Sequence, residues 1–329
     1  MPPSDDPDVL LGYYGQMLLI RRFEETLDEL FRGGSISGTT HLCAGQEAVA
    51  VGACTALEPS DQVLSNHRGH GHFIAKGGEP RRIMAELFGK VDGYSRGRGG
   101  SQHMAHFPIG FLGSNGITGG TIPIATGAAL SAKLQRAGRV VLAFFGEGAA
   151  NQGTFHESLN MGAAWDLPVI YVCENNLYAM STALSEVSRI ADIADRAAAY
   201  GMPGESVDGN DVLAVRDVVA RAAEQARGGR GPTLIEAKTY RYYGHSKSDQ
   251  REYRTDAEEA QWRAKDPIPR FGEWLTERGM LDAELQTRME QEVEAEIREA
   301  VSFAEGSPEP DPAEAGESVF ASTAESSSE

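Results

Sequence analysis

The chain has 329 residues, of which 41% are hydrophobic, and this length suits one large α/β domain or two smaller ones. Its net charge of −18 argues against a nucleic-acid partner, and no run of about 20 apolar residues is present that could span a membrane. The start at Met1–Asp6 lacks the basic flank and the apolar stretch of a secretory signal. Three widely separated cysteines in apolar surroundings indicate reduced core thiols, so we expect a cytoplasmic protein. They are Cys43, Cys54 and Cys173.

The first part of the chain is predicted to contain two helices and one short strand. Residues 1–9 are acidic and rich in proline, and we expect a flexible arm there. Residues 10–32 carry apolar side chains at helical spacing, and residues 45–57 form a second helical stretch made of small residues. Residues 62–65 are predicted to form a short strand that leads into 66–72, a polar loop rich in glycine and histidine.

The middle of the chain alternates between strands and helices. Residues 96–120 contain many glycines and little periodicity, and a loop of that length is usually functional. A predicted helix over 122–135 is followed by an apolar run without alternation over 140–145, which indicates a buried parallel strand. The segment Thr154–Glu157 has the spacing of a capping box and is predicted to open a helix, after which 168–174 forms the next strand.

The last third adds further elements before the pattern changes. Helices are expected over 190–200 and 212–227, and a core strand over 232–239. Residues 282–305 carry apolar side chains at steps of four with charges between them, which predicts a long amphipathic helix that packs on the sheet or on another chain. Residues 306–329 are mostly Ser, Glu, Pro and Ala, and we expect a disordered acidic tail.

The order of these elements predicts the fold class. Strands that alternate with helices favour an α/β protein with a doubly wound, mostly parallel sheet flanked by helices. We therefore expect a single α/β domain over residues 10–305, with a C-terminal helical extension.

A carboxylate framed by glycines follows the strand predicted over 140–145. Glycine at 146 and 148 would let the backbone approach a phosphate, but the carboxylate of Glu147 repels a phosphate unless a divalent cation lies between them. Asn176 ends the next strand, and the carboxyl ends of parallel strands meet at one edge of a sheet. Taken alone, Gly-Glu-Gly is more often a plain strand-to-helix turn. The paired amides Asn175 and Asn176 favour a magnesium-bridged diphosphate site instead.

Two other phosphate-binding motifs are weaker alternatives for this turn. The segment Gly146–Gly153 lacks the G-x-G-x-x-G spacing of a dinucleotide site, and its acidic residue lies inside the turn instead of about 20 residues further on. The chain also lacks the G-x-x-x-x-G-K-[ST] pattern of a P-loop.

Two further segments have both a plain and a functional interpretation. The loop His67–His72 contains three histidines, which allows a zinc site, although its glycine spacers and its lack of Cys or carboxylate argue against one. Its plain interpretation is an exposed polar loop. The segment Tyr240–Asp249, with aromatic, glycine and hydroxyl residues just past a strand, is by itself more often a surface loop.

The motifs together resemble a known family. The Gly-acid-Gly and Asn-Asn pattern is similar to the thiamine-diphosphate motif, and the wording GEGAANQG followed by CENNLYAMST resembles the α subunit of heterotetrameric 2-oxoacid dehydrogenases, pyruvate dehydrogenase and acetoin dehydrogenase in particular. The resemblance extends from the opening helix through the C-terminal helix. It implies a thiamine-diphosphate-binding fold and thiamine diphosphate and Mg²⁺ as cofactors.

The resemblance assigns a metal and diphosphate site to the central motif. It implies that the side chains of Glu147 and Asn176 and the backbone carbonyl of Tyr178 bind Mg²⁺, and that Gly148 and Ala149 contact the diphosphate together with the turn at Gly146. One departure concerns the metal ligand, because the family usually has Asp where this chain has Glu147. The extra methylene moves the carboxylate outward, so either the cation or the backbone must shift.

The resemblance also assigns roles to the surrounding loops. His67 and Arg68 would contact the cofactor, while His70 lines the substrate pocket and acts in catalysis. His245 would face the diphosphate and the reaction centre in a mobile loop. Two further positions follow from the resemblance alone. Gly116 and Thr118 would meet the aminopyrimidine ring through backbone groups, and Ser246 matches a position that is phosphorylated in some relatives.

The activity implied is the decarboxylation of a 2-oxoacid, pyruvate first, with transfer of the acyl group to the lipoyl arm of an acyltransferase component. An acetoin-cleaving dehydrogenase is the alternative. No segment resembles the pyrimidine-binding half of such a site, so we expect a β subunit to supply it in an α₂β₂ heterotetramer. Two remote alternatives are a transketolase-like half-enzyme, disfavoured by the NHRGHGH and YRYYGHSKSD segments, and a non-catalytic scaffold that kept the fold.

Overall fold

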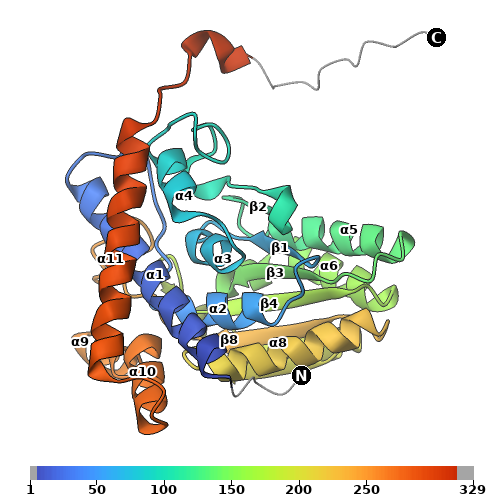
Figure 1. Cartoon of the computed structure of the whole chain (residues 1–329). Coiled ribbons are helices and arrows are strands. Elements are labelled where there is room, and N and C mark those ends of the chain that lie inside the picture. Colours follow the sequence, from blue (N-terminus) through green and yellow to red (C-terminus); the bar gives the residue numbers. More distant parts are fainter. Residues whose placement is uncertain (1–5, 317–329) are drawn as a thin grey trace.

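A parallel sheet lies at the centre of the protein. The computed structural model describes residues 6–316 (Figure 1). Within them, six strands pair in the order β2-β1-β3-β4-β8-β7, and every pairing is parallel. The strands are β1 (Gln62–Ser65), β2 (Phe111–Ser114), β3 (Val141–Gly146), β4 (Val169–Asn175), β7 (Gly204–Asp208) and β8 (Thr233–Lys238). A small antiparallel pair, β5 (Tyr178–Ala179) and β6 (Thr182–Ala183), follows β4.

The strand order places a binding crevice between β1 and β3. From β1 the chain moves outward to β2, then returns across β1 to β3 and continues to β4. The order of the strands therefore reverses between β1 and β3. In open parallel sheets, ligands bind beyond the carboxyl ends of the strands at such a reversal.

Helices cover both faces of the sheet. The cluster on one face includes residues of α1 (Pro7–Arg32), α2 (Glu47–Thr55), α3 (His70–Ala75), α4 (Pro80–Leu87), α8 (Val212–Arg227) and α10 (Pro267–Glu277), with α11 (Ala283–Gly306) packed against α1 and α4. The other face packs against α5 (Thr121–Leu134), α6 (Gly153–Ala164) and the 3-10 helix η4 (Ile193–Tyr200). The remaining elements are α7 (Leu184–Val187), α9 (Asp256–Arg263), η1 (Gly100–Gln102), η2 (Phe107–Ile109), η3 (Glu147–Asn151) and η5 (Pro312–Gly316). The doubly wound α/β fold expected from the sequence is therefore confirmed.

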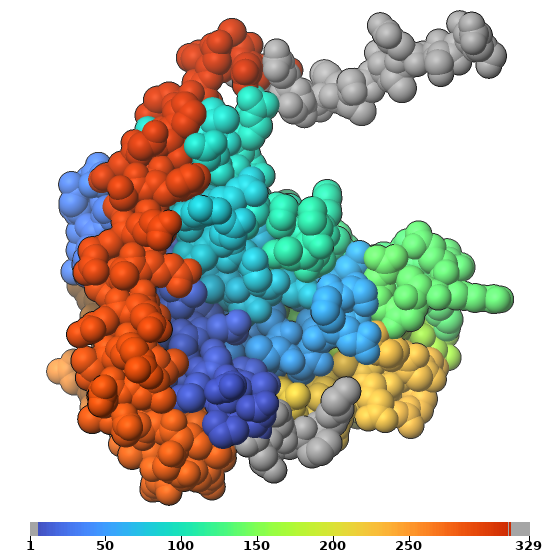
Figure 2. Space-filling model, viewed as in Figure 1, coloured from blue at the N-terminus to red at the C-terminus, as the bar shows by residue number. Residues whose placement is uncertain are grey.

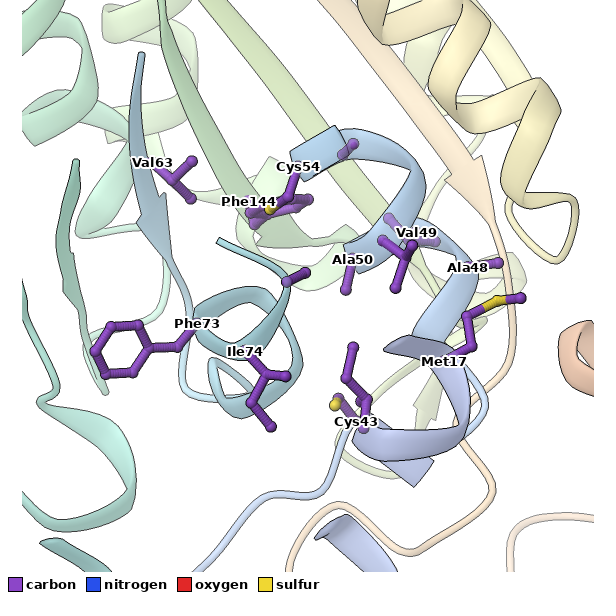
Figure 3. Packing of buried hydrophobic residues seen from close by; sticks show 14 of the residues in the cluster. Met17, Cys43, Ala48, Val49, Ala50, Cys54, Val63, Phe73, Ile74 and Phe144 are labelled. Atoms are coloured by element: carbon purple, nitrogen blue, oxygen red, sulfur yellow. The ribbon is translucent and has the colours of Figure 1, made fainter. Parts of the chain in front are cut away.

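The pleat of β3 divides its side chains between two hydrophobic clusters. Leu142 and Phe144 belong to the larger cluster beneath α1, α2 and α8, while Ala143 and Phe145 point to the opposite face. Figure 3 shows Met17 from α1 and Val49 from α2 gathered over this larger cluster. Because every residue of β3 from 141 to 145 is buried on one face or the other, its sequence is apolar without alternation.

The strands that the sequence predicted are confirmed to within one residue at each end, but two further strands of the main sheet were missed, as was the small pair β5 and β6. β2 lies inside the segment 96–120 that was expected to be a loop, and its Phe-Leu-Gly-Ser sequence is too short to show a period. β7 is an edge strand with the sequence Gly-Glu-Ser-Val-Asp and a partly exposed backbone row. Charged side chains are common on edge strands, where they prevent pairing with another chain. Because β7 carries such residues, it has no apolar run that would indicate a strand in the sequence.

Three local predictions were wrong. His70–Ala75 forms the buried helix α3, so the second half of the loop predicted over 66–72 is helical. The helix predicted over 190–200 begins only at Ile193 and has 3-10 geometry. The capping box at Thr154 does not form, because α6 begins one residue earlier, at Gly153. The residue before it, Gln152, has an extended backbone and makes no capping hydrogen bond with its side chain.

The two ends of the described chain differ from the sequence expectation. Helix α1 begins at Pro7, and the side chain of Asp6 accepts a hydrogen bond of 3.0 Å from the N–H of Asp8, so the end of the predicted arm is helical. Beyond α11, the carbonyl of Pro308 accepts a hydrogen bond from Val91 at 3.1 Å, so 307–316 is held by specific contacts. The rest of the predicted arm and tail lies outside the described residues.

The long helix α11 packs on other helices and not on the sheet. It contacts α1 and α4, and in Figure 2 it forms an orange-red ridge along the side of the molecule opposite α5. No helix among the described residues combines the length and the apolar character needed to cross a membrane. All three cysteines are free and buried, as the sequence predicted.

Candidate functional site

A cavity of about 290 Å³ opens at the carboxyl ends of β1, β3 and β4, where the strand order reverses. It brings together most of the site residues that the sequence suggested. These are His67, Arg68, Thr118, Gly146, Glu147, Gly148, Ala149, Asn176, Tyr178 and His245. The loops after parallel strands converge there because all the strands point the same way.

Glu147 and Asn176 lie next to each other in this cavity. The backbone N–H of Asn176 lies 3.3 Å from a carboxylate oxygen of Glu147, and the side-chain oxygen of Asn176 accepts a hydrogen bond of 3.4 Å from the N–H of Tyr178. Glu147 is 2% exposed and forms no ion pair within residues 6–316. Burial raises the pKa of Glu147, and hydrogen bonds from backbone N–H groups only partly oppose this effect.

The backbone around Glu147 leaves room for a ligand. A Cβ at Gly146 would have no neighbour within 4 Å, so its face of the turn is open to the cavity. A Cβ at Gly148 would come within 2.7 Å of the Cβ of Ala179, so only glycine fits where the turn meets the β5 strand. The short helix η3 begins at Glu147, at the same point.

These groups fit a hard cation that carries a diphosphate. A buried carboxylate without an ion-pair partner, next to an amide oxygen, is a donor set that Mg²⁺ can use together with phosphate oxygens. The described part of the chain contains no group of three or more His, Cys, Asp or Glu side chains that could hold a metal by itself. Phosphate oxygens would therefore have to complete the coordination shell.

The three histidines of the predicted loop point to different places, which removes the zinc interpretation. His67 lines the cavity, whereas His70 and His72 are buried on α3. Nδ1 of His70 lies 2.6 Å from Oε1 of Glu24, and Nδ1 of His72 lies 2.8 Å from the hydroxyl of Ser65.

Arg68 ties the cavity to the loop that carries His245. Its guanidinium is buried and donates hydrogen bonds to the carbonyl of Leu42 at 2.8 Å and to the carbonyl of His245 at 2.9 Å. Burial, and then repulsion from Arg241, lowers the pKa of Arg68 to about 9, so it remains charged at neutral pH. Arg68 also lies 3.2 Å from Nδ1 of His245. Because arginine can only donate, Nδ1 is the acceptor and neutral His245 carries its proton on Nε2.

Three imidazoles cluster beside Arg68. The ring of His41 lies 4.8 Å from that of His67 and 5.0 Å from that of His245, and the last two rings are 5.6 Å apart. Burial, followed by the charge of Arg68, lowers their pKa values to about 3 for His41, about 2 for His67 and about 4 for His245. All three are therefore neutral at physiological pH, and each can donate one hydrogen bond and accept another.

Sequence reasoning missed His41 because a single histidine after a Gly-Ser segment carries no motif. It also missed Glu174, which lies near the end of β4 and lines the cavity. The carboxylate of Glu174 accepts hydrogen bonds from Gln46 at 2.9 Å and from Asn66 at 3.0 Å, and it lies 3.1 Å from Nε2 of His72. Burial alone would raise the pKa of Glu174, but the charge of His72 and these hydrogen bonds outweigh it, so the pKa is lowered.

Three of the expected site residues do not line the cavity. His70 is fully buried between Glu24 and Ser101, whose hydroxyl lies 2.9 Å from Nε2. Gly116 lies beside the side chain of Gln102. Ser246 lines a neighbouring cavity of about 400 Å³ on the other side of the 240–251 segment. The roles expected for these three residues stay predictions.

Comparison with known proteins gives a consistent result. A model of the family described as the dehydrogenase E1 component matches residues 15–313. The α subunit of acetoin:2,6-dichlorophenolindophenol oxidoreductase from Bacillus subtilis is 48% identical over 313 residues, which cover 95% of this chain and 93% of that protein. The pyruvate dehydrogenase E1 component subunit alpha of Rhizobium meliloti is 45% identical over 305 residues, which cover 92% of this chain and 88% of that protein. The resemblance seen in the motifs is confirmed, and the chain belongs to the dehydrogenase E1 component family.

Proposed function

We propose that this chain is the α subunit of a thiamine-diphosphate- and Mg²⁺-dependent dehydrogenase first component that decarboxylates a 2-oxoacid, pyruvate first. In the overall reaction the substrate loses CO₂, its carbonyl carbon is oxidised to the acyl level, and the disulfide of a lipoyl carrier is reduced to a thioester and a thiol. The observation that carries the proposal is the buried Glu147 carboxylate beside Asn176, in a cavity at the reversal of strand order.

Different residues of the cavity would bind the metal and the diphosphate. Glu147, the side chain of Asn176 and the carbonyl of Tyr178 would hold Mg²⁺, and the turn from Gly146 to Ala149 would receive the diphosphate. When bound, thiamine diphosphate, which the dehydrogenase E1 family implies, supplies the nucleophilic carbon and the electron sink that decarboxylation requires.

The loops around the cavity would orient the cofactor and its substrate. Arg68 keeps His245 in the tautomer whose Nε2–H can donate to an anionic oxygen. His67 and Thr118 lie on the same wall, where they would contact the cofactor. The free, buried cysteines support a cytoplasmic enzyme.

A second subunit would complete the site. Ile117 and Met180 border the cavity and are 70% and 62% exposed, although large apolar side chains beside a polar site are better covered. A β subunit placed there would bury this apolar rim and supply the pyrimidine-binding half of the site. We propose an α₂β₂ heterotetramer that hands the acyl group to a lipoyl-bearing acyltransferase.

Acetoin is the second candidate substrate. It is favoured by the Bacillus subtilis relative, whose name describes an acetoin oxidoreductase and whose identity to this chain is 48%. Acetoin and pyruvate would place the same two-carbon fragment on the cofactor, so the α subunit can serve either one. The walls that select between them include residues of the β subunit.

The test is reconstitution of the enzyme with a β subunit of the same family. The complex is assayed with pyruvate, a branched 2-oxoacid and acetoin, with 2,6-dichlorophenolindophenol as the electron acceptor, and with each subunit alone as a control. We expect activity only in the complex and only with thiamine diphosphate and Mg²⁺. Robust decarboxylation by the isolated chain would refute the shared site. No cofactor binding by the complex would support a scaffold, and turnover of phosphosugars would support a transketolase-like half-enzyme.

A further inference from the structure

A buried carboxylate, that of Glu174, lies behind the proposed metal ligands and touches none of them directly. It is 1% exposed, and it collects hydrogen bonds from two carboxamides, those of Gln46 and Asn66. An ionised carboxylate accepts hydrogen bonds and donates none. Each of these carboxamides must therefore turn its NH₂ group toward Glu174 and its oxygen away from it.

The first carboxamide connects Glu174 to Asn176. Gln46 donates from Nε2 to Glu174 at 2.9 Å, and its oxygen accepts a hydrogen bond of 3.3 Å from the NH₂ group of Asn176. The NH₂ group of Asn176 is thereby occupied on the side of Gln46. Its oxygen faces the other way and accepts a hydrogen bond of 3.4 Å from the N–H of Tyr178. An asparagine that turned over would present NH₂ to a cation instead of oxygen.

The second carboxamide connects Glu174 to the turn after β1. Asn66 donates to Glu174 at 3.0 Å, and its oxygen accepts a hydrogen bond of 2.8 Å from the backbone N–H of Arg68. This contact fixes the turn that carries His67 and Arg68 into the cavity. One carboxylate thus controls both the metal side and the loop side of the site.

The third contact holds Glu174 itself in place. His72 lies 3.1 Å from Glu174 through Nε2, while its Nδ1 lies 2.8 Å from the hydroxyl of Ser65. The imidazole stacks on Phe144 with the ring centroids 3.7 Å apart. The carboxylate is therefore oriented by a rigid side chain of α3, and it is not free to follow the two carboxamides if they turn.

We infer that Glu174 is a positioning residue, which fixes the direction of Gln46 so that Asn176 presents its oxygen to the cation of the diphosphate. The inference rests on the proposed function and adds a residue that is not one of the proposed metal ligands. Glu174 acts through the order of donors and acceptors along Glu174–Gln46–Asn176. Its negative charge is not by itself the cause.

The experiment measures Mg²⁺ affinity by calorimetry at a fixed thiamine diphosphate concentration, on the complex with the β subunit. Glu174→Gln can donate to the oxygen of Gln46, which lets Gln46 and then Asn176 turn over. We expect Mg²⁺ affinity to fall about 10- to 100-fold, the range typical of partners that orient metal ligands. Gln46→Met leaves the charge of Glu174 in place but removes the hydrogen bonds of Gln46 to Glu174 and Asn176. We expect Mg²⁺ affinity to fall by a similar factor.

A variant of Asn176 separates direction from charge. Asn176→Asp offers oxygen on both sides, so it has no wrong orientation. In this background Glu174→Gln should cause no loss of Mg²⁺ affinity, because the turned Gln46 then donates to Asp at 176. Thermal unfolding without cofactor is recorded for every variant. If Glu174→Gln does not fold, Gln46→Met carries the test alone.

The outcomes separate the inference from the function on which it rests. Full Mg²⁺ affinity in Gln46→Met, or an undiminished loss on Glu174→Gln in the Asn176→Asp background, overturns the positioning role while wild type still binds. Absence of Mg²⁺-dependent thiamine diphosphate binding in the wild-type complex overturns the proposed function itself. A loss in both single variants that disappears with Asn176→Asp supports the inference.

Discussion

Two sides of the cavity are built by different means. The floor, formed by Glu147, Glu174 and Asn176, consists of side chains at the ends of β3 and β4, which the sheet holds in register. The roof, formed by His67 and His245 with His41 packed against both rings, comes from three loops that meet around Arg68. The floor concentrates buried carboxylates, and the roof holds neutral imidazoles beside a buried cation. A cofactor between them would meet its metal on one side and hydrogen-bond donors on the other.

The difference has an electrostatic cause. Burial lowers the pKa values of the imidazoles, and the charge of the neighbouring Arg68 lowers them further. Burial raises the pKa of Glu147. Burial thus disfavours charge on the imidazoles and on Glu147, whereas Arg68 stays charged and the pKa of Glu174 is lowered. A cation at Glu147 would favour its ionised form, and a diphosphate facing Arg68 would neutralise the buried guanidinium, so metal and diphosphate are expected to bind together.

The largest expected effect comes from removing the carboxylate of the floor. Glu147→Gln keeps the shape of the side chain but removes its negative charge. We expect Mg²⁺-dependent binding of thiamine diphosphate to weaken by more than about 100-fold, which exceeds the effect of removing a residue that only orients a metal ligand. Calorimetry on the complex with the β subunit measures this. Glu147→Asp is the matched control and should retain binding, because it keeps the charge and the family usually has Asp there. Unchanged affinity in Glu147→Gln would contradict a metal site at Glu147.

The second effect concerns Arg68, which connects the roof to the loop of His245. Arg68→Met removes the hydrogen bonds to Nδ1 and the carbonyl of His245 and to the carbonyl of Leu42, together with the positive charge. We expect diphosphate affinity to fall by at least about 10-fold, since one charge-assisted hydrogen bond contributes about 1.5 to 3 kcal/mol. We also expect the pKa of His245 to rise from about 4, because the charge of Arg68 lowers it. Titration by NMR measures the pKa, and Arg68→Lys, which keeps the charge, should show a smaller rise.

The third effect is a pH dependence of stability that belongs to the roof alone. The pKa of His245 falls from 6.5 to about 4 on folding. Between these two pH values His245 is protonated in the unfolded chain and neutral in the folded chain. Stability is therefore lost as the pH falls through this window. Between pH 7 and pH 5, His245→Asn should lose about 1 kcal/mol less unfolding free energy than the wild type, after allowance for solvent screening. Denaturant titration at both pH values checks this, and an equal loss in both proteins would contradict the shifted pKa.

The same contrast explains what the sequence could predict. β3 and β4 are buried on both faces, so their apolar runs are continuous, and the residues that follow them had to meet at one edge. Glu147 and Asn176 could be placed together on that ground alone. His67, Arg68 and His245 entered only through the family resemblance, because nothing local to a loop tells where it folds.

Other parts of the site could not be predicted, for physical reasons that the structure makes visible. Gln46 and Glu174 are 128 positions apart, and each is ordinary in its own segment. Their role depends on which end of a carboxamide faces a buried carboxylate, which is a property of tertiary contacts. His70 was expected in the substrate pocket, but its helix turns it toward Glu24 and Ser101. The 3.6-residue period of α3 separates neighbours that a loop would have kept together.

The smallest expected effect lies just outside the roof. Ser246 follows His245, yet its hydroxyl is exposed, lies 3.4 Å from that of Ser248 and lines the neighbouring cavity. We therefore expect Ser246→Ala to change unfolding free energy by less than about 0.5 kcal/mol, as exposed substitutions usually do, and to leave thiamine diphosphate affinity within about twofold. Calorimetry and denaturant titration of the complex measure both. A larger loss of affinity would mean that the loop turns Ser246 toward the diphosphate when the β subunit binds, so the roof would be assembled by the partner, unlike the floor.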